Sequence, residues 1–227
     1  MMDQNILFSE QKIPFVGKFT EILPLLFETI KYAAGAHLVS PFERIIIGVA
    51  GGAGAGKSKL ASEMVQHLAE FEPTIITMDR FYKDNVNNEL IDLEIPDAVD
   101  FNLVKETLSR IKDHDEQVVE LPVFNVSTLK RSGLETIKCG KLVIFEGPFS
   151  VYPEFQAFLN MGVFIDALES IRFQRRIAKE VQAKGKSYSA VQAHWNNTVS
   201  PAYFKYIAVQ RKFADVVVIN NEASHPL

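Results

Sequence analysis

The sequence predicts an α/β protein built around a mainly parallel β-sheet. Short apolar runs, rich in β-branched residues, alternate along the chain with longer segments whose apolar residues recur at helical spacing. This alternation is typical of parallel sheets covered by helices. The chain has 227 residues and a hydrophobic content of 47%, which is enough for one sizeable core. We therefore expect three layers, with the sheet between two layers of helices.

Residues 1–43 are expected to form an N-terminal helical extension, followed by a main domain at 44–227. The extension carries one apolar stripe at helical spacing, made of Phe19, Ile22, Leu23, Leu26, Phe27, Ile30 and Ala34. Pro24 lies within this pattern and indicates either a kink or the first turn. Packing against the main domain is the simplest role for this helix. A contact within a homo-oligomer and a lid over a site in the main domain are the alternatives.

The sheet is expected to contain five buried apolar runs. These are Ile45–Val49, Thr74–Met78, Lys141–Phe145, Val163–Asp166 and Asp215–Ile219. Gln117–Phe124 is a further candidate strand, and Pro122 within it favours an edge or antiparallel position because proline has no N–H to donate.

The segments between these strands are expected to be mainly helical. The predicted helices are Lys57 to about Glu70, Asn102–Lys112, Ser170–Ala183 and Tyr188 to about Phe213. Residues 80–97 are polar and rich in turn-forming residues, and we expect a loop there.

Composition excludes several classes of protein. The formal net charge of -4 and the pI of about 5.8 argue against a nucleic-acid partner, which usually requires a basic face. The single cysteine, Cys139, cannot form an internal disulfide, and this favours a reducing, cytoplasmic setting. No apolar run approaches the roughly 20 residues that a membrane helix needs, and residues 1–10 have no basic segment typical of a secretory signal.

The most specific motif is a phosphate-binding loop at residues 51–58, GGAGAGKS, which fits G-x-x-x-x-G-K-[ST] in full. It lies between a predicted strand and a predicted helix, as this motif requires. Small residues allow backbone N–H groups to converge on phosphate oxygens, and the helix directs its positive end at them. The residues expected to hold a nucleotide are Gly52, Ala53, Gly54, Ala55, Gly56, Lys57, Ser58 and Lys59. Lys57 is expected to reach the β- and γ-phosphates, and Ser58 to ligate Mg²⁺.

Two carboxylates follow neighbouring runs of the predicted sheet. Asp79 comes directly after Thr74–Met78, and Glu146 directly after Lys141–Phe145. Ligands of parallel sheets gather at the carboxyl ends of the strands, so both side chains should lie near the phosphates. We interpret Glu146 as a Mg²⁺ ligand, directly or through water. Asp79 is either a Mg²⁺ ligand or the general base for an acceptor hydroxyl.

A basic helix completes the candidate site. Arg172, Arg175, Arg176 and Lys179 are spaced so that they share one helical face. Such a face suits a lid that closes over a nucleotide and stabilises the charge on a transferring phosphoryl group. Arg172 and Arg175 are therefore candidate catalytic residues, and Arg176 is a candidate nucleotide contact.

Taken together, these segments resemble the uridine kinase and phosphoribulokinase group of P-loop kinases. The resemblance runs from about Ile45 to Val218 and rests on the order and spacing of eight segments. They are Gly48–Gly52, Gly56–Ser58, Met78–Lys83, Pro96–Asp100, Leu121–Phe124, Val143–Gly147, Arg172–Arg176 and Phe213–Val217.

The resemblance implies a P-loop kinase fold and transfer of the γ-phosphate of ATP to a hydroxyl of a nucleoside or related small metabolite. By this resemblance Asp79 is the catalytic base, Ser58 and Glu146 form the Mg²⁺ site, and the three arginines belong to a mobile lid. Residues placed near the acceptor are Asp79, Tyr82, Glu94, Asp97, Phe124 and Arg131.

The chain departs from the uridine kinase pattern at three acceptor positions. Glu94 stands where the family has an aspartate that holds the ribose, and is one methylene longer. Phe124 replaces a tyrosine and Leu129 replaces a histidine, both of which help to read the pyrimidine. These changes make the expected pocket more apolar, and such a pocket should discriminate poorly between bases. A small-molecule kinase is the leading hypothesis. The alternatives are a nucleotide-binding switch of the same fold without an acceptor, and a nucleotide hydrolase.

Overall fold

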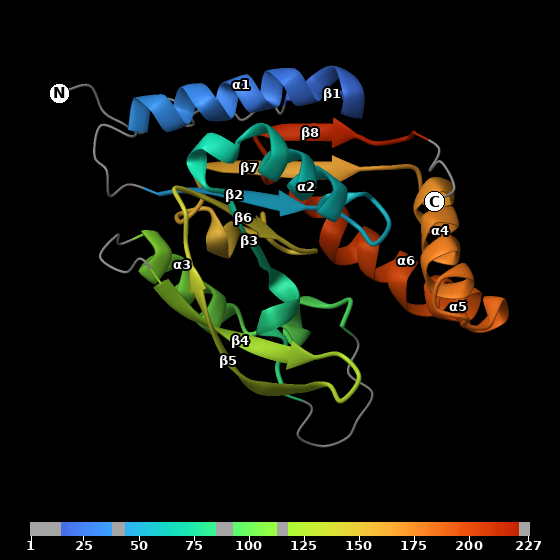
Figure 1. Cartoon of the computed structure of the whole chain (residues 1–227). Helices are drawn as coiled ribbons and strands as arrows, with labels where there is room; N and C mark the ends of the chain where they lie inside the picture. Colours follow the sequence, from blue (N-terminus) through green and yellow to red (C-terminus); the bar gives the residue numbers. More distant parts are fainter. Residues whose placement is uncertain (1–14, 38–43, 85–92, 113–117, 223–227) are drawn as a thin grey trace.

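The computed structural model describes residues 15–37, 44–84, 93–112 and 118–222. Its centre is a six-stranded sheet with the order β1-β8-β7-β2-β6-β3, in which every neighbouring pair is parallel (Figure 1). The strands are β1 (Phe15–Lys18), β2 (Ile45–Ala50), β3 (Thr74–Thr77), β6 (Leu142–Glu146), β7 (Met161–Asp166) and β8 (Val216–Ile219). The predicted α/β class with a mainly parallel sheet is confirmed.

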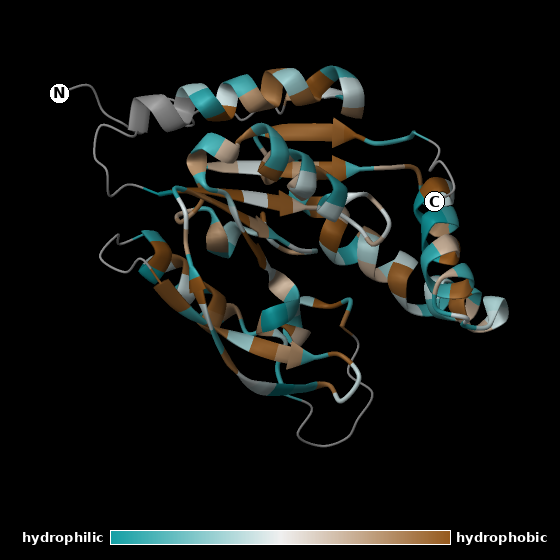
Figure 2. Ribbon diagram, viewed as in Figure 1, coloured by the Kyte–Doolittle hydropathy of each residue, from teal (hydrophilic) through white to brown (hydrophobic). Residues whose placement is uncertain are grey.

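Alternate residues of the central strands pack into two different cores. Ile45, Ile47 and Val49 of β2 face α1 (Phe19–His37) and α2 (Lys57–His67). Ile46 and Ala50 face the opposite side, where α3 (Phe101–Lys112) and much of the C-terminal half lie. Since side chains alternate between the faces of a strand, a run that is apolar throughout must be covered on both sides. Figure 2 shows the resulting apolar sheet between its two layers.

The N-terminal helix is part of this packing. Its apolar stripe is buried from Phe19 to Ile30, with Ile22 and Ile30 only 2% and 1% exposed, and Pro24 lies within the helix. Ahead of it, β1 pairs in parallel with β8 at the edge of the sheet. The sequence analysis did not predict β1, which is four residues long and includes a glycine. The expected boundary between 1–43 and 44–227 lies at residues outside the described part of the chain.

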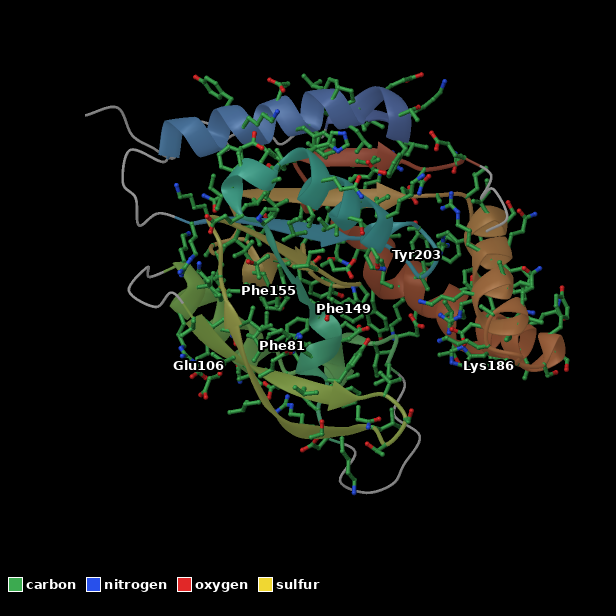
Figure 3. The ribbon with its side chains drawn as sticks, viewed as in Figure 1. Phe81, Glu106, Phe149, Phe155, Lys186 and Tyr203 are labelled. Carbon is green, nitrogen blue, oxygen red and sulfur yellow. The ribbon has the colours of Figure 1, made fainter. Side chains whose placement is uncertain are left out.

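A two-stranded antiparallel sheet lies beyond the second core. It is formed by β4 (Val118–Asn125) and β5 (Lys130–Lys138), and β4 confirms the antiparallel strand predicted from Pro122. Phe81, Phe149 and Phe155 lie between this part of the molecule and the main sheet (Figure 3).

The C-terminal half is mainly helical before it returns to the sheet at β8. Its elements are α4 (Glu169–Ile177), η5 (Ala178–Gln182), α5 (Tyr188–His194), η6 (Trp195–Val199), α6 (Ser200–Ala202), η7 (Tyr203–Ile207) and η8 (Ala208–Phe213). Of these, α4 and α5 form an arm that projects from the carboxyl end of the sheet (Figure 1). The later elements η7 and η8 pack in the second core, with Tyr203 and Ile207 buried there. Among the described residues, no helix is both long and apolar enough to cross a membrane.

Candidate active site

The phosphate-binding loop connects β2 to α2 at the carboxyl end of the sheet. Gly54 and Gly56 have φ angles of 77° and 110°, which lie in the left-handed region that favours glycine. A Cβ atom on Gly54 would also come within 2.4 Å of the Arg172 carbonyl oxygen. Gly56 is the N-cap of α2, so the loop leads directly to the positive end of that helix.

The side chain of Lys57 folds back onto the start of this loop. Its Nζ donates to the carbonyl oxygens of Gly51 and Gly52 at 2.9 and 3.3 Å. Burial lowers the pKa of the Lys57 ammonium, and the negative charges of Glu146, Glu94 and Asp79 act in the opposite direction. Three carboxylates therefore act electrostatically on Lys57, which is expected to reach the β- and γ-phosphates.

Ser58 and Glu146 meet in the structure as the sequence predicts for a metal site. The Ser58 hydroxyl donates to Oε1 and Oε2 of Glu146 at 3.2 and 3.3 Å. Burial raises the pKa of Glu146, while Lys57 and Ser58 oppose that rise. A cation beside this carboxylate would relieve the cost of burying its charge.

The oxygen atoms of Ser58 and Glu146 are of the chemical type that Mg²⁺ prefers as ligands. Mg²⁺ is commonly held by one or two protein groups, with waters and substrate phosphates filling its remaining positions. In the described part of the chain, no three His, Cys, Asp or Glu side chains gather as a metal cluster. Ser58 and Glu146 thus fit a metal bound together with a nucleotide better than a metal bound by protein alone.

Asp79 lies in η2 (Met78–Phe81), the turn that follows β3, and its side chain is exposed. The next residue, Arg80, ties this turn to the β4–β5 hairpin. Its Nη2 lies 2.7 Å from Oε2 of Glu135, and its Nη1 donates to the Pro122 carbonyl at 3.3 Å. The turn that carries Asp79 is therefore braced from the hairpin side.

The predicted acceptor residues divide into two groups. Tyr82 is buried, with its ring 5.4 Å from that of Phe124 and its hydroxyl donating to the Leu93 carbonyl at 3.1 Å. Arg131 binds the Tyr82 carbonyl at 3.1 Å and Asp100 at 3.2 Å. The polar atoms of Tyr82 and Arg131 therefore bind other groups of the protein in this structure.

Asp97 lies in η3 (Pro96–Ala98), and Glu94 lies just before this element. Glu94 lies 3.6 Å from Arg176 of α4, so an acceptor-side carboxylate and a lid arginine form an ion pair. Asp97 is exposed. The sequence places all of these residues near the acceptor, and their roles stay predictions.

The basic face of α4 is not uniformly directed at solvent. Arg172 is 1% exposed and lies over the Tyr203 ring, 3.6 Å from its centroid. Burial lowers the pKa of this guanidinium. A Cβ atom on Gly52 would lie 2.8 Å from Nη1 of Arg172, and this nitrogen is buried with no hydrogen-bond partner among the residues that the structure describes. Nη1 is therefore a donor left open beside the phosphate loop.

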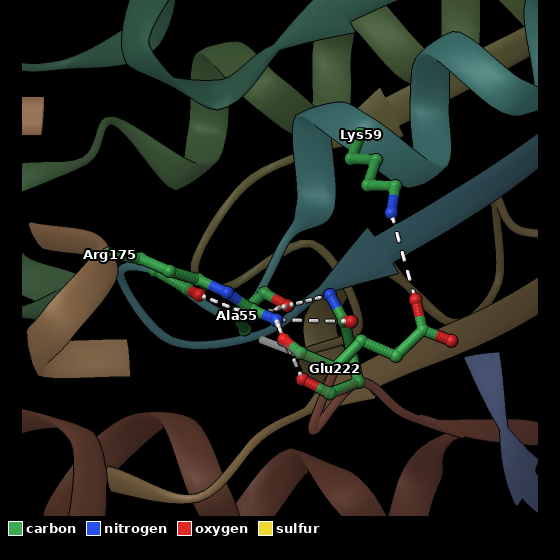
Figure 4. A network of polar contacts seen from close by, with 6 residues as sticks. Ala55, Lys59, Arg175 and Glu222 are labelled. Atoms are coloured by element: carbon green, nitrogen blue, oxygen red, sulfur yellow. Dashed lines mark hydrogen bonds and ion pairs between the residues drawn. The ribbon is translucent and has the colours of Figure 1, made fainter. Parts of the chain in front are cut away.

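Arg175, predicted as a catalytic residue, and Lys59, predicted as a nucleotide contact, are both engaged with other groups of the protein in this structure. Arg175 donates to carbonyl oxygens of the phosphate loop and of the segment after β8 (Figure 4). Nζ of Lys59 lies 3.9 Å from Glu222 and 4.6 Å from the centroid of the Phe19 ring. Lys59 thus points toward α1.

The sequence analysis missed Tyr203 and Asn220 as parts of this site. The Tyr203 hydroxyl donates to Asp166 at the end of β7 at 2.7 Å, and Nδ2 of Asn220 donates to the Ala55 carbonyl at 2.8 Å. Asp166 ends one strand and Asn220 follows another, so the rule that identified Asp79 and Glu146 also applied to them. Tyr203 carries no such signal.

Comparison with known proteins agrees with this geometry. The model of the phosphoribulokinase / uridine kinase family matches residues 46–224. The chain belongs to this family. It is 33% identical over 183 residues to a uridine kinase of Lactobacillus johnsonii, covering 77% of this chain and 85% of that protein.

Solved structures give the same fold at low sequence identity. A D-glycerate 3-kinase from Cryptococcus neoformans var. grubii superposes with a TM-score of 0.67 and 14% identity, covering 90% of this chain and 98% of that one. A phosphoribulokinase from Rhodobacter spheroides gives a TM-score of 0.58 and 12% identity, covering 82% and 74%. This family member is an ATP-dependent kinase of a small molecule. Both β1 and α1 precede residues 46–224, which the family model matches.

Proposed function

We propose that this kinase transfers the γ-phosphate of ATP to a hydroxyl of a nucleoside or a nucleoside-like metabolite. The observation that carries the proposal is the geometry at the carboxyl end of the sheet, where Nζ of Lys57 lies 2.9 Å from the Gly51 carbonyl of the phosphate loop and the Ser58 hydroxyl lies 3.2 Å from Glu146. The names of the relatives, uridine kinase and uridine-cytidine kinase, support a nucleoside as the acceptor.

Asp79 acts as the general base in this proposal. Its carboxylate is exposed beside the site and can accept a proton from an acceptor hydroxyl as that oxygen attacks the phosphorus. The brace through Arg80 limits the movement of the turn that carries it. In-line positioning of the hydroxyl is the main demand of phosphoryl transfer, so a fixed carboxylate contributes orientation as well as basicity.

Ser58 and Glu146 would hold Mg²⁺, and Lys57 would contact the β- and γ-phosphates. When bound, Mg²⁺ supplies neutralisation of the negative charge on the phosphate oxygens. Lys57 now donates to two loop carbonyls, and these bonds would be exchanged for phosphate oxygens. The open Nη1 of Arg172 is a further donor beside Gly52 for the same charge.

Glu94 and Arg176 would connect acceptor binding with the lid. In the structure they form an ion pair between η3 and α4. An acceptor with vicinal hydroxyls could bind the Glu94 carboxylate, as the resemblance implies, and release Arg176 toward the nucleotide. Beside Glu94 the acceptor would meet the rings of Phe124 and Tyr82, and the Tyr82 hydroxyl already donates to the Leu93 carbonyl. The acceptor would therefore be recognised mainly through the part that carries its hydroxyls.

An acceptor screen tests the proposal. ATP consumption is measured with the full chain and Mg²⁺ against a panel of nucleosides, sugars, pantothenate and glycerate. Turnover that depends on a nucleoside, and is lost in Asp79→Asn, is the expected result. Turnover with glycerate or pantothenate alone would refute the nucleoside assignment. ATP binding without transfer to any acceptor would instead favour a nucleotide-binding switch.

A further inference from the structure

The contacts of Arg175 differ from those expected of a residue that grips the transferring phosphoryl group. Its Nη1 donates to the carbonyl oxygens of Gly54 and Ala55 at 3.0 and 3.2 Å. Its Nη2 donates to the Glu222 carbonyl at 2.7 Å, and to the carbonyl and Oδ1 of Asn220 at 3.0 and 3.2 Å (Figure 4). Both terminal nitrogens of the guanidinium are thus directed at oxygen acceptors of the protein.

Asn220 supports the same part of the loop from the end of the sheet. Its side chain is buried, and Nδ2 donates to the Ala55 carbonyl at 2.8 Å. Its backbone N–H donates to the Asp166 carbonyl at 2.7 Å, which fixes it beside β7. A Cβ atom on Gly56 would come within 2.4 Å of the Asn220 side-chain nitrogen. The Ala55 carbonyl therefore receives donors from two elements far apart in the sequence.

The planarity of the peptide bond converts these contacts into a constraint on the nucleotide site. In a trans peptide the C=O of one residue and the N–H of the next point in opposite directions. A fixed Ala55 carbonyl therefore fixes the N–H of Gly56 on the opposite side. Gly56 is the N-cap of α2, and N–H groups at such a position bind phosphates. Gly56 has a φ of 110°. A glycine has little intrinsic preference for this backbone angle over the others open to it.

We propose that Arg175 and Asn220 are paired positioning residues of the phosphate loop, which hold the Ala55–Gly56 peptide so that its N–H faces the nucleotide phosphates. Arg175 acts through the loop and makes no contact with the transferring group. The inference rests on the nucleotide site of the proposed function. It assigns the charge-stabilising role on the lid to the other basic residues of α4 and η5.

The two roles for Arg175 predict different losses. A contact to the transferring phosphoryl group would lower kcat, with little effect on binding of ADP, which lacks the γ-phosphate. A disordered phosphate loop weakens the binding of ADP and ATP by the same factor. Asn220→Ala distinguishes them further, because Asn220 carries no charge and stabilises the same peptide.

Calorimetric titration with MgADP, and with Mg²⁺ and a non-hydrolysable ATP analogue, tests this inference on the full chain. We expect Arg175→Ala to weaken both ligands by about tenfold, equivalent to about 1.4 kcal/mol, and Asn220→Ala to weaken both by a smaller, equal factor. In the double variant the loss should be smaller than the product of the two single losses, because both side chains act on one carbonyl. Arg175→Lys keeps the charge but cannot bridge the phosphate loop and the segment after β8. It should restore less than half of the binding free energy that Arg175→Ala loses.

Lys184→Ala is the matched control. Lys184 is a cation of the same arm and pairs with Glu180, so its removal should leave the affinity for ADP unchanged. Circular dichroism and Tm identify any variant that fails to fold, and Arg175→Lys and Asn220→Ala then carry the test. Weakened binding of the ATP analogue with unchanged ADP binding would overturn the positioning role, as would unchanged binding of both ligands. Absence of ADP binding by the unmodified protein would refute the proposed function itself.

Discussion

We expect the buried carboxylate of Glu180 to make a measurable contribution to stability. Glu180 lies in η5 and is 6% exposed. Its oxygens lie 3.1 Å from Nζ of Lys184 and 2.6 Å from Nζ of Lys186, and its backbone carbonyl accepts from the N–H of Lys186 at 2.9 Å. These contacts outweigh the effect of burial and lower the pKa of Glu180 from 4.5 to about 2.

The size of the effect follows from this pKa and from the exposure of the lysines. A fall from 4.5 to about 2 corresponds to about 3.4 kcal/mol, at about 1.36 kcal/mol for each pH unit. The lysine side chains are 52% and 57% exposed, so solvent screens the pairs, and about 1–2 kcal/mol is a realistic value. Glu180→Gln should lower the free energy of unfolding by this amount at pH 7.

Urea unfolding at a series of pH values tests the reasoning. Because the folded-state pKa is depressed, the stabilisation is fully present above about pH 4.5 and is lost as the pH falls toward about 2. The difference between the unmodified protein and Glu180→Gln should shrink over this interval. Glu106→Gln, on the exposed face of α3 (Figure 3), should stay within about 0.5 kcal/mol throughout. A Glu180→Gln difference that is negligible at pH 7, or that does not change with pH, would refute the account.

Two further predictions concern the phosphate loop and the N-terminal helix. Lys57→Ala should lower ATP turnover by at least about a hundredfold through lost stabilisation of the phosphates, and near-normal steady-state turnover would contradict the loop assignment. Ile30→Ala should lower the free energy of unfolding by about 2–5 kcal/mol because Ile30 is 1% exposed. Tyr32→Ala, at a side chain 72% exposed, is its control. Equal urea midpoints for these two variants would show that α1 does not belong to the main cooperative unit.

Patterns in the sequence predicted the parts of the fold that burial determines. The runs Ile45–Ala50 and Leu142–Phe145 contain no polar side chain, and both are buried in strands of the main sheet. By contrast β5 is exposed along almost its whole length, so it has no alternation to detect. It is recognisable as a strand only through its pairing with β4.

The candidate site also has parts that the sequence predicts and parts that it does not. The ends of parallel strands necessarily share one edge of the sheet, and this rule placed Asp79 and Glu146 around Lys57. Helical spacing showed that Arg172 and Arg175 share a face of α4, but spacing does not specify which atoms a side chain reaches. The contacts of Arg175 depend on Asn220 and Glu222, which come from a distant segment and are set by tertiary packing.

Transfer of radiolabelled γ-phosphate from ATP is the most direct test of the central claim. The label is followed to three destinations: unreacted ATP, inorganic phosphate and the best acceptor of the screen. We predict that the label appears on the acceptor, and that Asp79→Asn slows this transfer by about a hundredfold or more while Glu106→Gln does not. Label found only in inorganic phosphate, or transfer that is unchanged in Asp79→Asn, would contradict the account.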